Sequence, residues 1–216
     1  MPHCRANLET DCQPACFPGY DRGADRPGNR RGYWFRAIHI EGRIMIRGDK
    51  VTLRSLEDDD SEMLRGWRND PELSQYACNA IPISQIEQRT WYDGYAKNKT
   101  YQVFIIEDEA KDPIGYCLVK NLDHLNRNAE IGGYLIPKVQ GKGYGKDVFK
   151  TLMKYCFKEL NMHRVYLQVF AFNTRAVQLY EKLGFKIEGT FRDAFFKQGR
   201  YQDLVQMSIL EAEFKM

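Results

Sequence analysis

A glycine-rich turn at residues 140–146 restricts the folds that this chain can adopt. Its sequence is Gln-Gly-Lys-Gly-Tyr-Gly-Lys, and it follows an apolar segment that Pro137 ends. Three glycines in five residues let the backbone take positive φ angles and approach a ligand closely. Free N–H groups at a helix start, the helix dipole and two lysines all favour an anion there. The turn therefore predicts a pyrophosphate-binding loop between a strand and a helix.

Two other phosphate-binding motifs do not fit this turn. A Walker A loop ends in Gly-Lys-Ser/Thr, and the dinucleotide-binding fingerprint has the spacing Gly-x-Gly-x-x-Gly. Neither pattern occurs at residues 140–146. A plain strand-to-helix connection can also be rich in glycine, so the function of the turn depends on the elements around it.

The hydrophobic pattern from residue 51 onward predicts an α/β domain. Runs of period 2 predict strands and apolar residues at helical spacing predict helices. Pro71 ends one helix, Ser84 and Glu87 form a capping box, and Gly184 ends another helix. Helices between neighbouring strands make the sheet partly parallel, and hairpins make it mixed. The expected strands are 51–54, 101–107, 113–120, 129–136, 164–172, 185–198 and 201–210, and the expected helices are 57–69, 84–95, 145–160 and 174–183.

The composition changes near residue 45. Residues 1–44 contain seven arginines and no lysine, whereas residues 45–216 contain ten arginines and fifteen lysines. The first segment shows no sustained period of 2 or 3.6, so we expect a disordered tail. A sharper hypothesis is that residues 1–44 are a non-native extension and that the natural chain starts at Met45. The expected catalytic domain is then 45–216.

Charge and composition exclude several classes of protein. The net charge of +3 is too small to indicate nucleic-acid or membrane-surface binding, and the seven arginines of the first segment are offset by five acids. No apolar run approaches the roughly 20 residues that cross a bilayer, and no secretory h-region is present. We therefore expect a cytoplasmic protein with no nucleic-acid or membrane partner.

The six cysteines do not indicate a metal site. Cys4, Cys12 and Cys16 lack the paired short spacing of zinc ligands, so we expect no metal. Cys78, Cys117 and Cys156 lie far apart, and the last two sit in apolar segments. These three are expected to be reduced core residues.

Two motifs at a fixed separation resemble the GNAT superfamily of acyl-CoA N-acyltransferases. Residues 140–145 resemble its Gln/Arg-x-x-Gly-x-Gly/Ala signature, and residues 129–132, Ala-Glu-Ile-Gly, resemble its central strand. Further on, residues 173–185 resemble its Asn-x-x-Ala-x-x-Leu-Tyr-x-x-x-Gly-Phe block. The resemblance covers about residues 49–211. It implies a single domain with a mixed central sheet, splayed strands and flanking helices, and acetyl-CoA as the co-substrate.

The resemblance also implies roles for individual residues. Tyr180 would protonate the leaving thiolate, Asn173 would contact the cofactor, and the backbone of the central strand would pair with the pantetheine chain at Tyr134, Leu135 and Ile136. The residues implied to bind the pyrophosphate through the backbone are Gln140, Gly141, Lys142, Gly143, Tyr144, Gly145 and Lys146.

The chemistry of amide formation supports these roles. An alkylammonium, with a pKa of about 10.4, must lose a proton before it attacks a thioester. Glu130 on the central strand could receive that proton through water, although a structural carboxylate is an equal alternative. A strand N–H can stabilise the oxyanion, and a phenol can return a proton to a thiolate whose conjugate pKa is about 8.5. Tyr180 without the motif would be interpreted as a core aromatic.

The acceptor amine is less well defined. Residues 160–167 and 188–203 resemble spermidine N-acetyltransferases and acetyltransferases of ribosomal-protein N-termini. Residues 67–71, Trp-Arg-Asn-Asp-Pro, instead resemble a helix end of enzymes that acetylate amino-sugars. A polycation needs desolvated negative partners, and the candidates are Glu72, Glu87 and Glu130.

These observations lead to three functional hypotheses. The first is transfer of acetyl to a small-molecule primary amine, with a polyamine such as spermidine favoured over an amino-sugar. The alternatives are acetylation of protein N-termini and a non-catalytic acyl-CoA-binding regulator, which would not need Tyr180. We also expect a homodimer or a higher oligomer.

Overall fold

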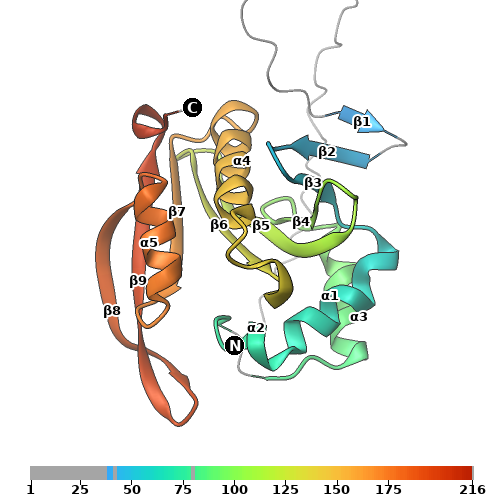
Figure 1. Ribbon diagram of the computed structural model, residues 1–216, viewed down its shortest axis with the longest axis horizontal. Helices are drawn as coiled ribbons and strands as arrows, with labels where there is room; N and C mark the ends of the chain where they lie inside the picture. The colour runs from blue at the N-terminus through green and yellow to red at the C-terminus, as the bar shows by residue number, and fades with distance from the viewer. Residues whose placement is uncertain (1–37, 41–42, 79–80, 216) are drawn as a thin grey trace, which may run out of the picture. The chain divides into compact units, whose positions relative to one another are not determined.

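The computed structural model describes residues 38–40, 43–78 and 81–215. Within them, strands form one sheet in the order β1-β2-β3-β4-β5-β6-β7-β9-β8 (Figure 1). The strands are β1 (Ile38–Ile40), β2 (Arg43–Arg47), β3 (Thr52–Ser55), β4 (Gln102–Glu107), β5 (Pro113–Asp123), β6 (Asn128–Leu135), β7 (Arg164–Phe170), β8 (Lys186–Lys197) and β9 (Arg200–Leu210). β6 and β7 run parallel and the other neighbours antiparallel, so the predicted mixed sheet is confirmed.

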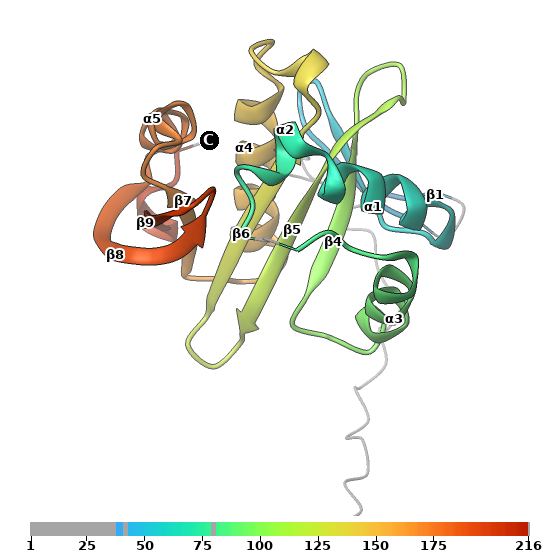
Figure 2. The same ribbon diagram turned by 90° about the horizontal axis from the view of Figure 1, so that it is seen from below.

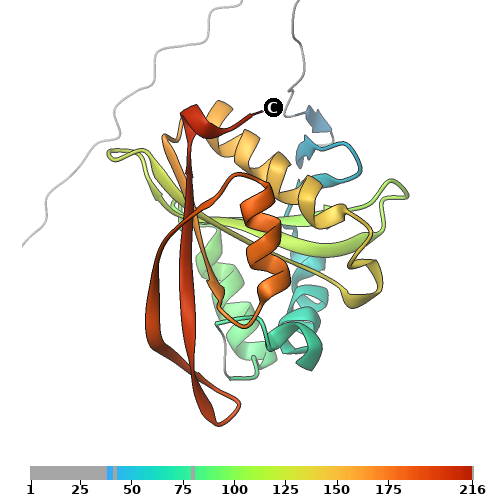
Figure 3. The ribbon, with the colours of Figure 1, turned by 60° about the vertical axis from the view of Figure 1, so that its left-hand side comes forward.

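Helices cover both faces of the sheet. They are α1 (Ser61–Asn69), α2 (Pro71–Ser74), α3 (Gln85–Tyr95), α4 (Tyr144–Lys158) and α5 (Thr174–Lys182), with 3-10 turns η1 (Asp58–Asp60), η2 (Pro137–Val139) and η3 (Glu211–Glu213). Figures 2 and 3 show α4 and α5 on one side of the sheet and α1 and α3 on the other. Among these helices, none is long and apolar enough to span a bilayer.

Alternation along β4 shows how the two layers form. Phe104 and Ile106 face the larger core, which includes α4 and α5. Val103 and Ile105 face a second cluster with Leu64 of α1 and aromatic residues of α3. Because successive side chains of a strand point to opposite faces, one apolar run can supply both cores.

A gap opens in the middle of the sheet, between β6 and β7. The two strands pair only over Asn128–Arg164, Ala129–Val165 and Glu130–Tyr166. β5 continues to pair with β6 as far as Leu135. One edge of β6 is therefore left without a strand partner after Glu130, which confirms the expected splay.

Most predicted elements are present, and the structure adds the short helix α2 and the strands β1 and β2. The Ser84–Glu87 capping box starts α3 as predicted. Asp70 ends α1, but its side chain also accepts from the N–H groups of Glu72 and Leu73 and so starts the short helix α2. The predicted boundary at Met45 lies inside β2, and β1 precedes it. Residues 1–37, which make up most of the predicted tail, lie outside the described residues.

Candidate functional site

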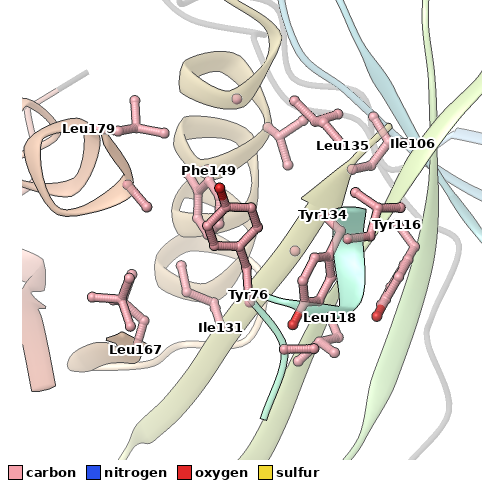
Figure 4. A pocket seen from close by; sticks show the side chains of 18 of the residues that line it. Tyr76, Ile106, Tyr116, Leu118, Ile131, Tyr134, Leu135, Phe149, Leu167 and Leu179 are labelled. Atoms are coloured by element: carbon pink, nitrogen blue, oxygen red, sulfur yellow. The ribbon is translucent and has the colours of Figure 1, made fainter. Parts of the chain in front are cut away.

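One pocket of about 700 Å³ runs through the gap between β6 and β7. In Figure 4, Ile131, Tyr134 and Leu135 of β6 lie on one side of it, and Phe149 of α4 and Leu179 of α5 lie on the other. One end reaches the glycine-rich loop and the other reaches the aromatic residues between β5, α1 and α3. We call these the loop end and the aromatic end.

The loop end is shaped by glycines in the left-handed region. Gly141 has φ +84° and Gly143, the N-cap of α4, has φ +89°. An L residue is strained there, so these positions favour glycine. Gln140 braces the loop by donating from Nε2 to the carbonyl of Leu135 at 2.9 Å.

Two cations beside the loop were not found from the sequence. A Cβ built on Gly143 would lie 3.8 Å from Nζ of Lys50, and one built on Gly141 would lie 3.3 Å from Nη2 of Arg175. Lys50 comes from the β2–β3 turn and Arg175 from the first turn of α5. Neither lies in the glycine-rich motif, and only the fold brings them to it. Both add to the positive field for a pyrophosphate.

The carboxylate of Asp147 holds the β2–β3 turn against α4. It accepts three backbone hydrogen bonds, from the N–H groups of Asp49 (3.0 Å), Lys50 (2.7 Å) and Val51 (3.1 Å). A side chain at Gly48 would disturb this contact, because a Cβ would lie 2.5 Å from Oγ1 of Thr151 and 2.6 Å from Oδ2 of Asp147. Asp147 is buried in the first turn of α4 and so links Lys50 to the loop.

The free edge of β6 offers peptide groups to a ligand. The N–H of Ile136 donates to Ile114 of β5 at 3.0 Å, so that peptide points away from the gap. Antiparallel strands alternate the direction of their peptide groups, so the N–H groups of Leu135 and Gly133 point into the gap. The carbonyl of Ile136 also accepts from Val139 at 3.2 Å. This corrects the expectation for Ile136 and for Tyr134, which lies opposite Tyr116 of β5 and whose peptide groups point the same way by this alternation.

Tyr180 lies on α5 beside the gap. Its ring makes an edge contact with Phe149, at a centroid distance of 4.9 Å, and a tilted contact with Phe185, at 5.8 Å. Burial raises the pKa of its phenol above the ordinary value. No hydrogen bond joins the hydroxyl to another described residue, and the side chain lines the pocket. A neutral phenol held in this way can donate a proton.

Asn173 begins the helix that carries Tyr180. Its side-chain oxygen accepts from the N–H of Ala176 at 3.3 Å, as an N-cap does. Asn173 also lines the pocket, so it can contact a ligand while it starts α5.

Glu130 is buried at the aromatic side of the gap, with two close partners. Nζ of Lys120 lies 2.9 Å from Oε1, and Nδ2 of Asn121 donates to Oε2 at 2.9 Å. A carboxylate has about four acceptor positions, so Glu130 can still accept from water. Its two partners nevertheless give it a structural role as well.

Aromatic side chains dominate the other end of the pocket. Tyr116 and Tyr134 lie side by side in Figure 4, with ring centroids 5.2 Å apart, and Trp91 and Tyr101 also line this end. Sequence periodicity assigned them to strands and helices but could not show that they meet. Of the three acids considered for a polycation, only Glu130 lines the pocket; Glu72 and Glu87 are exposed near the ends of α2 and α3.

The pocket brings together most of the residues expected from the sequence. Ile136, Lys142 and Tyr144 do not line it, because Ile136 and Tyr144 pack against the core and Lys142 points to solvent. The expected residues that do line it are Glu130, Tyr134, Leu135, Gln140, Gly141, Gly143, Gly145, Lys146, Asn173 and Tyr180.

Cys78 corrects one further expectation. Cys117 and Cys156 are buried and free, as predicted, but Cys78 is exposed at the wall of the aromatic end. It follows α2 in a turn.

Lys197 ties the C-terminal hairpin to the turn that contains Cys78. Its ammonium donates to the carbonyls of Ser74 (2.6 Å) and Ala77 (2.7 Å), and it lies 5.9 Å from the ring centroid of Phe170. Burial lowers the pKa of Lys197. Because Ala77 and Cys78 line the pocket, Lys197 holds one wall of the aromatic end in place.

Replacing Lys197 with methionine is expected to raise KM for the ligand of the aromatic end about tenfold, while KM for the ligand of the loop end stays unchanged. Hydrogen bonds from a charged donor contribute on the order of 1.5–3 kcal/mol each. Their loss should therefore let the turn with Ala77 and Cys78 move. Maleimide labelling of Cys78, resolved by peptide mass, should become faster. Lys186→Met is the matched control, because Lys186 lies in the same strand but pairs with Glu213 at the surface. Equal labelling rates in both variants would contradict the prediction.

Comparison with known proteins is consistent with this geometry. Residues 50–186 match the acetyltransferase (GNAT) domain family. Spermidine N(1)-acetyltransferase of Vibrio cholerae serotype O1 is 32% identical over 165 residues, which cover 76% of this chain and 95% of the relative. The crystal structure of the Vibrio cholerae spermidine N-acetyltransferase with CoA and spermine has a TM-score of 0.73 at 32% identity, covering 76% of this chain and 96% of that one. A dodecameric structure of that enzyme in an intermediate state has a TM-score of 0.68 at 32% identity, covering 75% and 94%.

Proposed function

Since the chain belongs to the GNAT acetyltransferase family and is an acetyl-CoA-dependent N-acetyltransferase, we propose that it acetylates a primary amine of a small molecule by direct attack on the thioester. The loop end of the pocket would hold the pyrophosphate of the cofactor. The aromatic end would hold the acceptor amine.

The observation that carries this proposal is the continuity of the pocket. Gly141 and Gly143 line one end, Trp91 and Tyr101 line the other, and Tyr180 lines the same pocket from α5. A cofactor and an acceptor that enter from opposite ends would meet at the free edge of β6. Direct transfer needs the two reactants in one cavity, because holding both in the right geometry removes much of the entropic cost of their encounter.

The proposed cofactor contacts follow from the free groups in the gap. The backbone of the glycine-rich loop, with Lys146, Lys50 and Arg175, would bind the pyrophosphate. The N–H groups of Gly133 and Leu135 would bind the pantetheine chain, as a strand partner would, and one of them would donate to the oxyanion. In this set, Gly133 takes the place of Tyr134 and Ile136, and Leu135 is kept.

The proposed proton path uses two side chains. The ammonium of the acceptor would release a proton through water to Glu130, and the neutral amine would attack the thioester carbonyl. The tetrahedral intermediate would then collapse with cleavage of the carbon–sulfur bond. Tyr180 would give its proton to the departing thiolate, and the second proton of the attacking nitrogen would pass through water to Tyr180, leaving a neutral amide, free CoA and the restored phenol.

Polyamines are the first acceptors that we propose. The support is the similarity to proteins named for spermidine, and Glu130 is a carboxylate in the described part of the pocket lining. Amino-sugars are the second acceptors, because residues 67–71 resemble the corresponding helix end in enzymes that act on them. The cytoplasmic location of the protein remains a prediction.

Assembly into a homo-oligomer is also part of the proposal. The dodecameric relative supports it, and β8 is an edge strand of the described sheet. Exposed apolar side chains lie along the β8–β9 hairpin, namely Ile187, Phe191, Phe196 and Tyr201. An unpaired strand edge with exposed apolar side chains favours association with another chain.

The test is thiol release from acetyl-CoA across a panel of amines: spermidine, spermine, amino-sugars and peptides with free N-termini. We expect turnover with at least one small amine and a product of the corresponding acetylated mass. Turnover with peptides alone would favour acetylation of protein N-termini. Binding of acetyl-CoA without turnover on any amine would favour the non-catalytic regulator.

A further inference from the structure

Arg68 is a cation in the wall of the aromatic end. It lies in the last turn of α1, half-buried, with its guanidinium 5.2 Å from the ring centroid of Trp91. One N–H group donates to Oε1 of the buried Gln88 at 3.2 Å. Stacking and this single hydrogen bond hold the guanidinium in one place, and Arg68 lines the pocket.

The charges around Arg68 do not balance within the described residues. Arg68, Lys120 and Glu130 are the charged side chains that line the aromatic end. Glu130 is already paired with Lys120 at 2.9 Å and takes a hydrogen bond from Asn121. No carboxylate of a described residue forms an ion pair with Arg68. This end therefore carries one net positive charge, located at Arg68.

Two tyrosines complete a polar surface next to the guanidinium. Tyr101 and Tyr116 line the pocket, and the positive charge of Arg68 opposes the rise that burial produces in the pKa of both phenols. The ring of Trp91, over which the guanidinium lies, is in edge contact with the ring of Tyr101 at a centroid distance of 6.3 Å. Within the described part of the chain no hydrogen bond engages either hydroxyl, so both can donate to a ligand.

A half-buried guanidinium with unused donors fits one kind of ligand well. It presents a planar fork of N–H groups that matches a carboxylate or a phosphate, and such charge-assisted hydrogen bonds are stronger than neutral ones. An ammonium in the same place would meet a like charge in a setting that screens it poorly. The desolvation free energy of the Arg68 guanidinium is offset if the ligand places an anion beside it.

We propose that Arg68, with Tyr101 and Tyr116, forms a subsite for a carboxylate or phosphate group of the acceptor. The acceptor would be an amine that also carries an anionic group, with the amine toward Tyr180 and the anion at Arg68. This rests on the proposed N-acetyltransferase function and sharpens its acceptor class. Of the two acceptor classes above, it favours amino-sugars, in a form that carries a carboxylate or a phosphate, over polyamines.

Matched pairs of amines test the subsite with the full-length protein. Putrescine and 4-aminobutyrate differ at one end, where a terminal CH2–NH3+ group is replaced by a carboxylate. Glucosamine and glucosamine 6-phosphate differ by a phosphate, and spermidine completes the panel. We expect kcat/KM to be at least about tenfold higher for the anionic member of one or both pairs, which corresponds to about 1.4 kcal/mol. The first pair reports a carboxylate source and the second a phosphate source.

Arg68→Gln should remove that preference while KM for acetyl-CoA stays the same. Glutamine keeps hydrogen-bonding capacity but loses the charge. Arg89→Gln is the matched control, because Arg89 lies on α3, pairs with Asp58 and Asp93 at the surface and does not line the pocket. The control should keep the wild-type preference.

The outcomes separate this inference from the function on which it rests. Higher kcat/KM for spermidine or putrescine than for every anionic amine would overturn the subsite and leave the acetyltransferase intact. An anionic preference that survives in Arg68→Gln would also overturn it. If no amine is acetylated although acetyl-CoA binds, the proposed function itself fails. Should the variant misfold, the comparison of amine pairs with the wild-type protein still decides.

Discussion

Tyr180→Phe is expected to lower kcat by roughly 10²–10⁴-fold, the range that general acid–base catalysis usually contributes. The variant loses one hydroxyl, and its ring can keep the contacts with Phe149 and Phe185. Affinity for acetyl-CoA should therefore stay near the wild-type value. Thiol-release kinetics with the best acceptor, together with calorimetric binding of CoA, measure the two quantities.

Tyr155→Phe is the matched control for that substitution. Tyr155 is another buried tyrosine, on α4, whose hydroxyl donates to Oε1 of Gln102 at 3.0 Å and which does not line the pocket. Loss of this hydroxyl should reduce the free energy of unfolding with little effect on kcat. If both variants lost turnover equally, the proton-donor role of Tyr180 would have to be abandoned.

The pH dependence of kcat offers a second view of Tyr180. Burial raises its pKa, so the neutral phenol persists above the ordinary tyrosine value of about 10. We expect no loss of kcat between pH 7 and about pH 10 from this group, since the donor form is retained. The raised pKa of Tyr180 also contributes to the free energy of unfolding. This contribution is fully present below the pKa that the tyrosine has in the unfolded chain, and it is lost as the pH rises toward the pKa in the folded protein.

Asp147→Ala is expected to reduce the free energy of unfolding by about 3 kcal/mol. It removes the acceptor of three backbone N–H groups and leaves the buried N–H of Val51 unpaired. Hydrogen bonds to a charged acceptor and unsatisfied buried donors both carry costs of this order. Urea unfolding, followed by tryptophan fluorescence, gives the change in free energy. KM for acetyl-CoA should also rise, because Lys50 loses its place beside the glycine-rich loop.

Lys50→Met separates the two effects of Asp147. The turn keeps its three hydrogen bonds to Asp147, so stability should be unchanged, while the loss of the charge should raise KM for acetyl-CoA several-fold. A similar loss of stability in Lys50→Met and Asp147→Ala would show that the charge, and not the hydrogen-bonded turn, holds this corner of the fold.

Local patterns predicted most elements because their physical causes are local. The Ser84–Glu87 box starts α3 through hydrogen bonds that span three residues. Gly184, with φ +96°, follows the end of α5 as a C-cap does. The helix α2 was not predicted, because Asp70-Pro71 ends one helix and starts the next with the same residues. β1 and β2 were not predicted either, because their short runs become strands by pairing with each other and with β3.

The glycine-rich turn and the Asn173–Tyr180 spacing predicted a cofactor site, since backbone conformation and helix periodicity follow from nearby residues. Tertiary structure alone decided which groups share the pocket. Arg68 and Arg175 line it from α1 and α5, and Lys50 lies beside its glycine-rich loop from the β2–β3 turn. The register of β5 against β6 decided that the N–H group of Gly133 faces the gap and that those of Tyr134 and Ile136 do not. Contacts between residues distant in sequence depend on how strands pair and helices pack, and no periodicity within one segment records them.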